Sequence, residues 1–480
     1  MAVSPLPEII QGGMGVAVSS WRLARAVATA GQLGVVSGTA LDVVLARRLQ
    51  DGDAGGHARR ALSAFPVPAM AARVLDRYLR VDGRPAGRPY APTPKLQLHP
   101  SAASLELSMV GAFAEVWLAK EGHDGVVGIN FLEKVQLATP SAAYGAMLAG
   151  VDVVLVGAGI PAQIPRLLDG LAAHRSVTLD VHVDGATTDY AVGLDPVTLT
   201  GGGLAPLRRP RLLAIVSAHV LAAHLARRPE TVPDGFVIEG PSAGGHNAPP
   251  RGRLVLDDDG QPVFGPRDQA DLAAVAAVGL PFWLAGGQGT PEQVRRAREL
   301  GAAGVQVGSL FALAQESGLD PDLRRSLVDD LAAGTLEVRT DARASPTRFP
   351  FKVASVPGTQ SDPAVYAARP RLCDVGHLRV PFERRPGTVG YRCPGEPLDV
   401  YVEKGGKAED TVGRTCLCNA LLADVGLGQT RRDGYRETPL LTFGADLTGG
   451  AVLAARHPAG WHADDVLAYL LERPGARRDA

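Results

Sequence analysis

His246 directly follows a pair of glycines, in the segment EGPSAGGHN at residues 239–247. Imidazole titrates near neutral pH, so His246 is suited to take a proton from a carbon acid of moderate pKa. The glycines before it, Gly244 and Gly245, carry no Cβ and let the backbone approach a flat ligand closely. His246 is therefore a candidate general base, with an ordinary loop or packing histidine as the alternative.

Three more glycine clusters follow short apolar runs: IIQGGMG at 9–15, LAGGQGTPEQ at 284–293 and GAAGVQVGSLF at 301–311. The first is also compatible with a simple tight turn. The last two leave backbone N–H groups free beside expected helix starts, where anions bind well. Neither contains Arg or Lys, so amide donors would carry most of the binding of a phosphate.

The elements that must position these clusters alternate along the first 335 or so residues. Short apolar runs rich in β-branched residues are separated by stretches of helical length, which is typical of a parallel α/β fold. An open doubly wound sheet is an alternative, but eight strand–helix units favour a closed (β/α)8 TIM barrel, whose active site lies at the carboxyl ends of the strands. The expected strands are Glu8–Gln11, Leu33–Ser37, Val126–Phe131, Val151–Val156, Leu212–Val216, Phe236–Glu239, Phe282–Ala285 and Val305–Val307.

Two insertions interrupt the alternation. Residues 39–122 are too long for one crossover and predict several helices, whereas 177–207 predict a hairpin. We expect residues 1–340 to form the barrel and 341–480 a smaller α+β region rich in Gly, Pro and Cys. In that region, helices are expected at 415–423 and 463–471.

The four glycine motifs, in this order and spacing, resemble the nitronate monooxygenase family, which is related to flavin-dependent enoyl-thioester reductases. The resemblance covers roughly residues 5–335 and implies a TIM barrel with bound FMN. By position, His246 matches the family's base, which removes the proton α to a nitro group. The residues that the resemblance implies at the cofactor are Gly12, Gly13, Met14, Asn130, Glu239, Gly244, Gly245, Gly286, Gly287, Gln306, Gly308 and Ser309.

Two positions depart from the family pattern. Glu239 stands where the family usually has Gln, and Ser242 where it usually has Glu. A carboxylate at 239 would disfavour an anionic reduced flavin or bind a different polar group of the substrate. Lys134 lies four residues past Asn130, where it would either face the mouth of the barrel or lie in a solvated loop.

These features predict an FMN-dependent, monooxygenase-like oxidoreductase that oxidises a small carbon acid, with His246 as base and O2 as the oxidant of the flavin. One alternative is an enoyl-thioester reductase that uses NAD(P)H. Others are a lyase or isomerase that binds its substrate at the phosphate site, and a flavin-binding module without turnover.

Four cysteines, Cys373, Cys393, Cys416 and Cys418, all fall in the last quarter of the chain. They could hold a structural zinc ion or an iron–sulfur cluster, but the Cys-x-Cys spacing is not that of a usual zinc site. Ordinary buried thiols are the preferred interpretation. Disulfides are not expected in a reducing compartment.

Charge and hydropathy exclude several classes of partner. Because 49 basic residues nearly balance 50 acidic ones, nothing favours nucleic acid or an anionic membrane as partner. No uninterrupted apolar run reaches about 18 residues, the length of a membrane span. The first ten residues lack the pattern of a secretory leader, so a cytoplasmic location is the default expectation. No oligomeric state is predicted.

Overall fold

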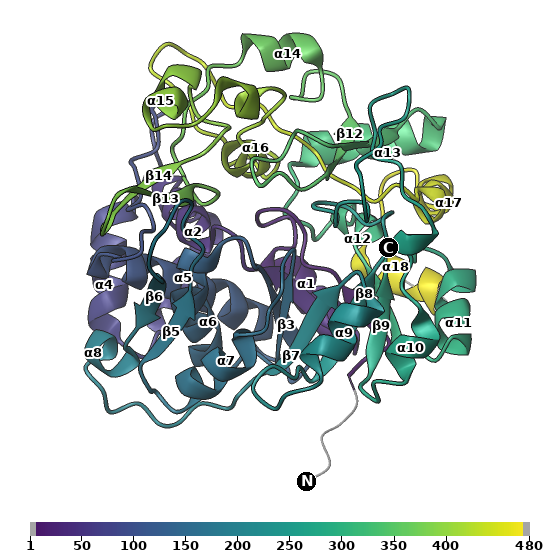
Figure 1. Ribbon diagram of the computed structural model, residues 1–480, viewed down its shortest axis with the longest axis horizontal. Coiled ribbons are helices and arrows are strands. Elements are labelled where there is room, and N and C mark those ends of the chain that lie inside the picture. Colours follow the sequence, from purple (N-terminus) through teal and green to yellow (C-terminus); the bar gives the residue numbers. More distant parts are fainter. Residues whose placement is uncertain (1–5, 474–480) are drawn as a thin grey trace.

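Eight parallel strands form a closed barrel in the computed structural model, which describes residues 6–473 (Figure 1). Around the ring the order is β1-β10-β9-β8-β7-β4-β3-β2, and a parallel bridge between Ile10 and Leu33 joins β1 to β2. All eight strands predicted from the sequence are present, so the closed (β/α)8 barrel is confirmed. Their bounds are β1 Ile9–Gln11, β2 Gly34–Ser37, β3 Val127–Leu132, β4 Val153–Gly157, β7 Arg211–Val216, β8 Gly235–Glu239, β9 Phe282–Ala285 and β10 Gly304–Val307.

Both faces of the barrel strands are buried, which explains why the strand sequences are continuously apolar. Side chains of alternate residues fill the interior, among them Ile10, Val35, Leu155 and Trp283. The indole Nε1 of Trp283 donates to the carbonyl of Pro7 at 3.0 Å and so closes the amino end of the barrel. The intervening residues pack outward against the helices.

Helices cover the outside of the barrel close to the predicted positions. Several begin with a capping side chain and proline in the first turn, as at Thr290-Pro291 and Asp320-Pro321. Helix α10 is short and has only five residues. The helices are α1 Trp21–Thr29, α6 Thr139–Leu148, α7 Ile164–Ala172, α9 His219–Leu225, α10 Leu272–Ala276, α11 Pro291–Glu299, α12 Ser309–Ala312 and α13 Pro321–Ala333.

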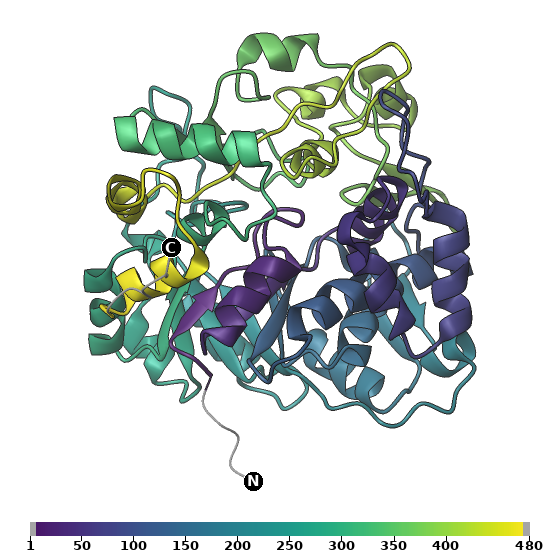
Figure 2. The ribbon, with the colours of Figure 1, turned by 180° about the vertical axis from the view of Figure 1, so that it is seen from behind.

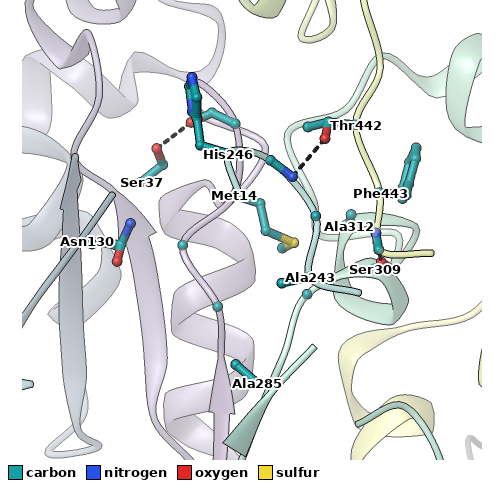
Figure 3. Close-up of a pocket in the computed structure, with 18 of the residues that line it drawn as sticks. Met14, Ser37, Asn130, Ala243, His246, Ala285, Ser309, Ala312, Thr442 and Phe443 are labelled. Carbon is teal, nitrogen blue, oxygen red and sulfur yellow. Dashed lines mark hydrogen bonds between the residues drawn. The ribbon is translucent and has the colours of Figure 1, made fainter. Parts of the chain in front are cut away.

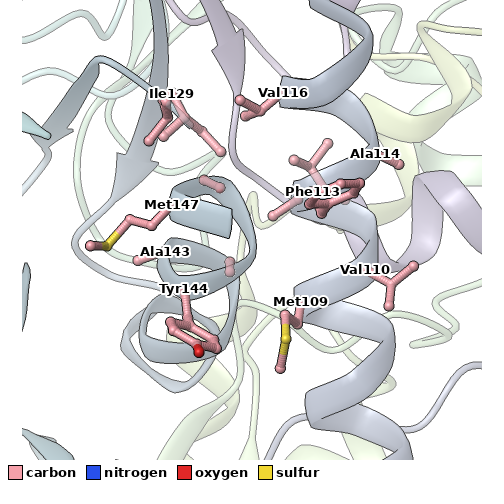
Figure 4. Packing of buried hydrophobic residues seen from close by; sticks show 14 of the residues in the cluster. Met109, Val110, Phe113, Ala114, Val116, Ile129, Ala143, Tyr144 and Met147 are labelled. Atoms are coloured by element: carbon pink, nitrogen blue, oxygen red, sulfur yellow. The ribbon is translucent and has the colours of Figure 1, made fainter. Parts of the chain in front are cut away.

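The insertion after β2 holds four α-helices: α2 Leu41–Gln50, α3 His57–Ser63, α4 Pro68–Tyr78 and α5 Ala102–Lys120. Among residues 6–473, α5 alone is long and apolar enough to cross a membrane, yet 72% of its apolar window is buried inside the protein. Met109 and Phe113 of α5 belong to one buried hydrophobic cluster with Tyr144 and Met147 of α6 (Figure 4). Helix α5 is therefore a core helix of this fold.

The second insertion contains the predicted hairpin, formed by β5 Val177–Asp180 and β6 Ala191–Leu194, followed by α8 Pro196–Thr200. Beyond the barrel, two more antiparallel pairs form. These are β11 Glu337–Asp341 with β12 Phe351–Ser355, and β13 Val380–Arg385 with β14 Thr388–Arg392. Strand β11 crosses residue 340, where the sequence places the boundary between the barrel and the C-terminal region. That division of the chain into two regions stays a prediction.

The rest of the C-terminal region has more helix than predicted. Helices α16 Leu417–Ala423 and α18 Ala463–Leu470 were expected, whereas α14 Pro363–Ala368, α15 Leu398–Glu403 and α17 Thr448–Arg456 were not. The green and yellow-green part lies over the carboxyl ends of the barrel strands, while α17 and α18 return to the flank of the barrel (Figures 1 and 2). Buried Trp461 and Leu467 join the barrel core there. The prediction that the first ten residues are not a secretory leader falls partly on residues 1–5, which lie outside the described residues.

Candidate functional site

A large pocket opens at the carboxyl ends of the barrel strands, and all four glycine motifs line it. Figure 3 shows Asn130 and Ser309 on opposite sides, with the thioether of Met14 between them. The pocket therefore brings together the elements that the sequence placed at one end of the barrel. Every residue predicted to contact the cofactor lies in its lining: Gly12, Gly13, Met14, Asn130, Glu239, Gly244, Gly245, Gly286, Gly287, Gln306, Gly308 and Ser309.

Two glycines of the lining are required by geometry. A Cβ on Gly13 would lie 2.3 Å from the Cβ of Asn130, so the loop after β1 can touch β3 only without a side chain. Gly286 has a φ of +83°, and a Cβ there would lie 2.9 Å from the backbone nitrogen of Ala243. The loops after β8 and β9 can therefore pack this closely only because residue 286 is a glycine, which adopts a positive φ and has no Cβ.

Two buried amide oxygens in the lining lack partners. Asn130 Oδ1 on β3 and Gln306 Oε1 on β10 have no hydrogen-bond partner among the described residues. An unsatisfied buried polar atom costs about 1–3 kcal/mol, so it usually has a partner in the functional state. A ligand with polar groups at its edge would satisfy both oxygens.

The end of the pocket beside α12 has a mixed electrostatic character. Gly444 N donates to Ser309 Oγ at 2.9 Å, so the C-terminal chain covers this end. Asp446 also lines the pocket and accepts from Gln293 Nε2 at 2.9 Å. Burial favours its neutral form, but the hydrogen bonds from Gln293 and Thr448 prevail and lower the pKa of Asp446. An anion bound here would meet backbone amides and one carboxylate.

Glu239 ends β8, with its side chain half-buried against the pocket. Desolvation raises the pKa of Glu239 to about 8. The carboxyl group is therefore mostly protonated at neutral pH and can donate a hydrogen bond. In this state it resembles the glutamine amide that the family pattern usually places here.

His246 lines the pocket where the loop after β8 meets the β11–β12 hairpin. Its Nε2 lies 2.7 Å from Ser345 Oγ, which in turn lies 2.8 Å from Thr347 Oγ1. The ring packs edge-on against Phe351 at a centroid distance of 4.9 Å. Burial, and then the positive charge of Lys134, lower the pKa of His246 to about 4. The imidazole is thus neutral and oriented at physiological pH.

Lys134 lies in the loop after β3. Its Nζ lies 3.6 Å from a carboxylate oxygen of Glu133 and 4.8 Å from the centre of the Phe349 ring. Both interactions leave the ammonium close enough to His246 to lower the pKa of that histidine. Lys134 therefore acts on the site electrostatically.

The four cysteines converge in the C-terminal region. Burial, followed by the charges of neighbouring cysteines, raises the pKa of Cys393, Cys416 and Cys418, and burial also raises that of Cys373. Within residues 6–473, no group of three or more His, Cys, Asp or Glu side chains is arranged to hold a metal ion. None of the four described cysteines forms a disulfide, and their interpretation as ordinary buried thiols stays a prediction.

The sequence reasoning missed the part of the site contributed by the C-terminal region. Thr442 Oγ1 accepts from Gly245 N at 2.9 Å (Figure 3). Ala445 N donates to Ser242 O at the same distance. His377 and Cys418 also line the pocket. No glycine motif or spacing marks these positions, and their proximity arises only from the tertiary fold.

Fold and site together define a (β/α)8 barrel with a glycine-lined ligand pocket at the carboxyl ends of its strands. Residues 208–350, which carry β7 to β10 and His246, match the family model for nitronate monooxygenase. Over this segment the chain is similar to that family.

Curated relatives match part of the chain. A nitronate monooxygenase from Pseudomonas aeruginosa is 33% identical over 183 residues, which is 35% of this chain and 50% of that protein. A (3aS,4S,5R,7aS)-5-hydroxy-7a-methyl-1-oxo-octahydro-1H-indene-4-carboxyl-CoA dehydrogenase from Mycobacterium tuberculosis is 28% identical over 210 residues, 40% of this chain and 56% of that protein. The chain thus spans about half the length of these relatives.

Solved structures resemble the chain over nearly its whole length, at low sequence identity. FabK from Thermotoga maritima is 15% identical with a TM-score of 0.47, covering 97% of this chain and 92% of that one. A nitroalkane oxidase from Streptomyces ansochromogenes is 16% identical with a TM-score of 0.43, covering 98% and 96%.

Proposed function

We propose that the protein is an FMN-dependent oxidoreductase of the nitronate monooxygenase type, which oxidises a small carbon acid with His246 as base and O2 as oxidant. The observation that carries the proposal is the glycine-lined pocket, in which unpartnered amide oxygens and a neutral, buried histidine face one cavity. The family match over residues 208–350 supports the same conclusion. When bound, FMN supplies the redox chemistry by accepting electrons from the substrate.

The residues of the pocket fit this cofactor. Gly12 and Gly13 offer backbone without side chains on one side, and Met14 beside them lines the pocket. Asn130 and Gln306 offer amide groups whose oxygens otherwise lack partners, and these suit the polar edge of an isoalloxazine. The remaining glycines and Ser309 provide amide donors for the phosphate, at the position where barrels commonly bind one.

The role of His246 follows from its surroundings. A base must be unprotonated before it acts, and a pKa of about 4 keeps the imidazole neutral throughout the physiological range. The hydrogen bond to Ser345 and the contact with Phe351 fix the orientation of the ring. We propose that His246 removes the proton α to the activating group of the substrate.

The first experiment is an absorbance spectrum of the purified protein, followed by identification of the chromophore that heat releases. FMN is expected, and a colourless protein that does not take up added FMN would contradict the proposal. The second compares oxygen uptake with a small nitronate and NADPH consumption with an enoyl thioester. Oxygen uptake without NADPH is expected, and the opposite pattern would favour the reductase alternative.

The base is tested by His246→Gln. This variant should keep its flavin but lose about 10²- to 10⁴-fold in kcat/KM with a neutral nitroalkane, whose proton must be removed. His182→Gln is a matched control, because the side chain of His182 is 82% exposed on the β5–β6 hairpin. Equal activity of the two variants would refute the assignment of His246 as base.

A further inference from the structure

A second histidine, His377, lines the same pocket and forms a buried pair with a carboxylate. Its Nε2 lies 3.1 Å from one oxygen of Asp42 and 3.2 Å from the other. The side chains of His377 and Asp42 are 5% and 6% exposed. Asp42 belongs to α2 in the first insertion, whereas His377 precedes β13. The pair therefore joins two segments that both lie outside the family match at 208–350.

The other ring nitrogen of this histidine is unsatisfied. His377 Nδ1 is buried and has no hydrogen-bond partner among residues 6–473. A buried Asp–His pair needs further hydrogen bonds to offset the desolvation of its charges. Since Asp42 occupies Nε2, the free Nδ1 is the position left for a ligand. Burial favours the neutral form of Asp42, but its charge interaction and hydrogen bond with His377 prevail and lower the pKa of Asp42.

The neighbours of His377 in the pocket lining are apolar. Leu378, Leu417 and Leu421 form a wall beside it, all from the C-terminal region. Such a wall would hold the aliphatic body of a ligand, and the unpartnered Nδ1 of His377, when it carries a proton, would donate to an oxygen at its end. Glycine backbone, by contrast, dominates the side of the pocket where the cofactor is proposed.

From this arrangement we propose that the Asp42–His377 pair is a second polar anchor for the substrate, with Nδ1 of His377 donating to a carboxylate or carbonyl oxygen. The substrate class is then an aliphatic carbon acid that carries an oxygen acceptor besides its reacting carbon. This inference rests on the proposed function for the identity of the reaction, but the binding site itself can be tested separately.

The test uses octanoate as the probe and isothermal titration calorimetry of the full-length protein as the readout. Octanoate should bind the unchanged protein, and octylamine, which has the same chain and the opposite charge, should not. Asp42→Asn and His377→Gln should each weaken octanoate binding by about 10- to 100-fold, the value of a hydrogen bond to a charged group. His462→Gln is the matched control, because His462 pairs with Glu316 at 2.9 Å outside the pocket lining.

Removing one partner of a buried pair can destabilise the fold. The thermal midpoint is therefore measured for each variant, and the double variant Asp42→Asn/His377→Gln provides a neutral pair that leaves no charge uncompensated. This double variant should fold and still lose octanoate binding.

Unchanged octanoate affinity in the folded double variant, or equal binding of octylamine, would overturn the inference. If the protein lacks flavin yet octanoate binding depends on His377, the anchor stands and the proposed oxidoreductase fails. If flavin and nitronate oxidation are present but octanoate binding ignores His377, the proposed function stands and the anchor is wrong.

Discussion

The carboxyl group of Glu239 should make cofactor binding depend on pH. Desolvation raises its pKa to about 8, so it is protonated at pH 7 and ionised above pH 9. In the proposed complex the protonated form donates a hydrogen bond to FMN, while the ionised form would place a negative charge against it. In Glu239→Gln the side chain keeps its shape and a hydrogen-bond donor, but it no longer ionises in this pH range.

The magnitude follows from the two pKa values. One pH unit above a pKa of about 8, only about a tenth of the carboxyl groups keep their proton, so the apparent Kd for FMN should rise about tenfold from pH 7 to pH 9. The stability of the apoprotein should also depend on the ionisation of Glu239. Between the ordinary glutamate pKa of 4.5 and about pH 8, the folded state binds more protons than the unfolded chain, so its free energy of unfolding falls as pH rises. The full difference corresponds to about 5 kcal/mol, reduced where water in the pocket screens the charge.

Fluorescence titration of the apoprotein with FMN from pH 6 to 9.5 measures the first effect. Urea unfolding at pH 5 and 8 measures the second. In Glu239→Gln the FMN affinity should vary little with pH, and the apoprotein should be more stable than the unchanged one at pH 8. The same pH dependence in both proteins would refute the conclusion that Glu239 binds the cofactor as a neutral acid.

Three further perturbations test other parts of the pocket. Gly13→Ala would place a Cβ 2.3 Å from that of Asn130, so purified protein should lose its flavin and about 1–3 kcal/mol of stability, seen in the spectrum and the urea midpoint. Lys134→Met should raise the pKa of His246 from about 4 and move the acid limb of the kcat/KM profile to higher pH. Asp446→Asn removes a carboxylate beside the phosphate loops and should strengthen binding of FMN several-fold but leave riboflavin unchanged.

The barrel could be predicted because its strands are buried on both faces. Runs such as Val153–Val156 have no alternation, which distinguishes them from half-exposed strands, and glycines at their carboxyl ends mark where loops approach a ligand. The positions predicted for the site all lie in one pocket, because parallel strands of a barrel deliver their carboxyl ends to the same rim.

The C-terminal half of the pocket could not be predicted. Ser345 reaches His246 only because the β11–β12 hairpin folds back beside the loop after β8, with Lys352 N donating to Gly245 O at 2.9 Å. Thr442 and His377 reach the pocket through similar long-range contacts. Such contacts leave no period or spacing in the sequence, and a lone serine or threonine in an irregular segment has many equivalent neighbours.

The pocket is divided between the segment that matches the family model and segments outside it, and this division bears on which substrate the proposed oxidoreductase would take. Residues 208–350 supply His246 and the loops after β8, β9 and β10, which in the proposed function would serve any substrate that reacts at the flavin. Another part of the lining comes from residues 377–421, and its polar group, His377, is held by Asp42 of the first insertion. A family match confined to the first set constrains the reaction, while the second set determines the shape and polarity met by the rest of the substrate. Substrate choice in this chain should therefore follow the Asp42–His377 pair and its leucines, and exchanging them should change KM more than it changes flavin binding.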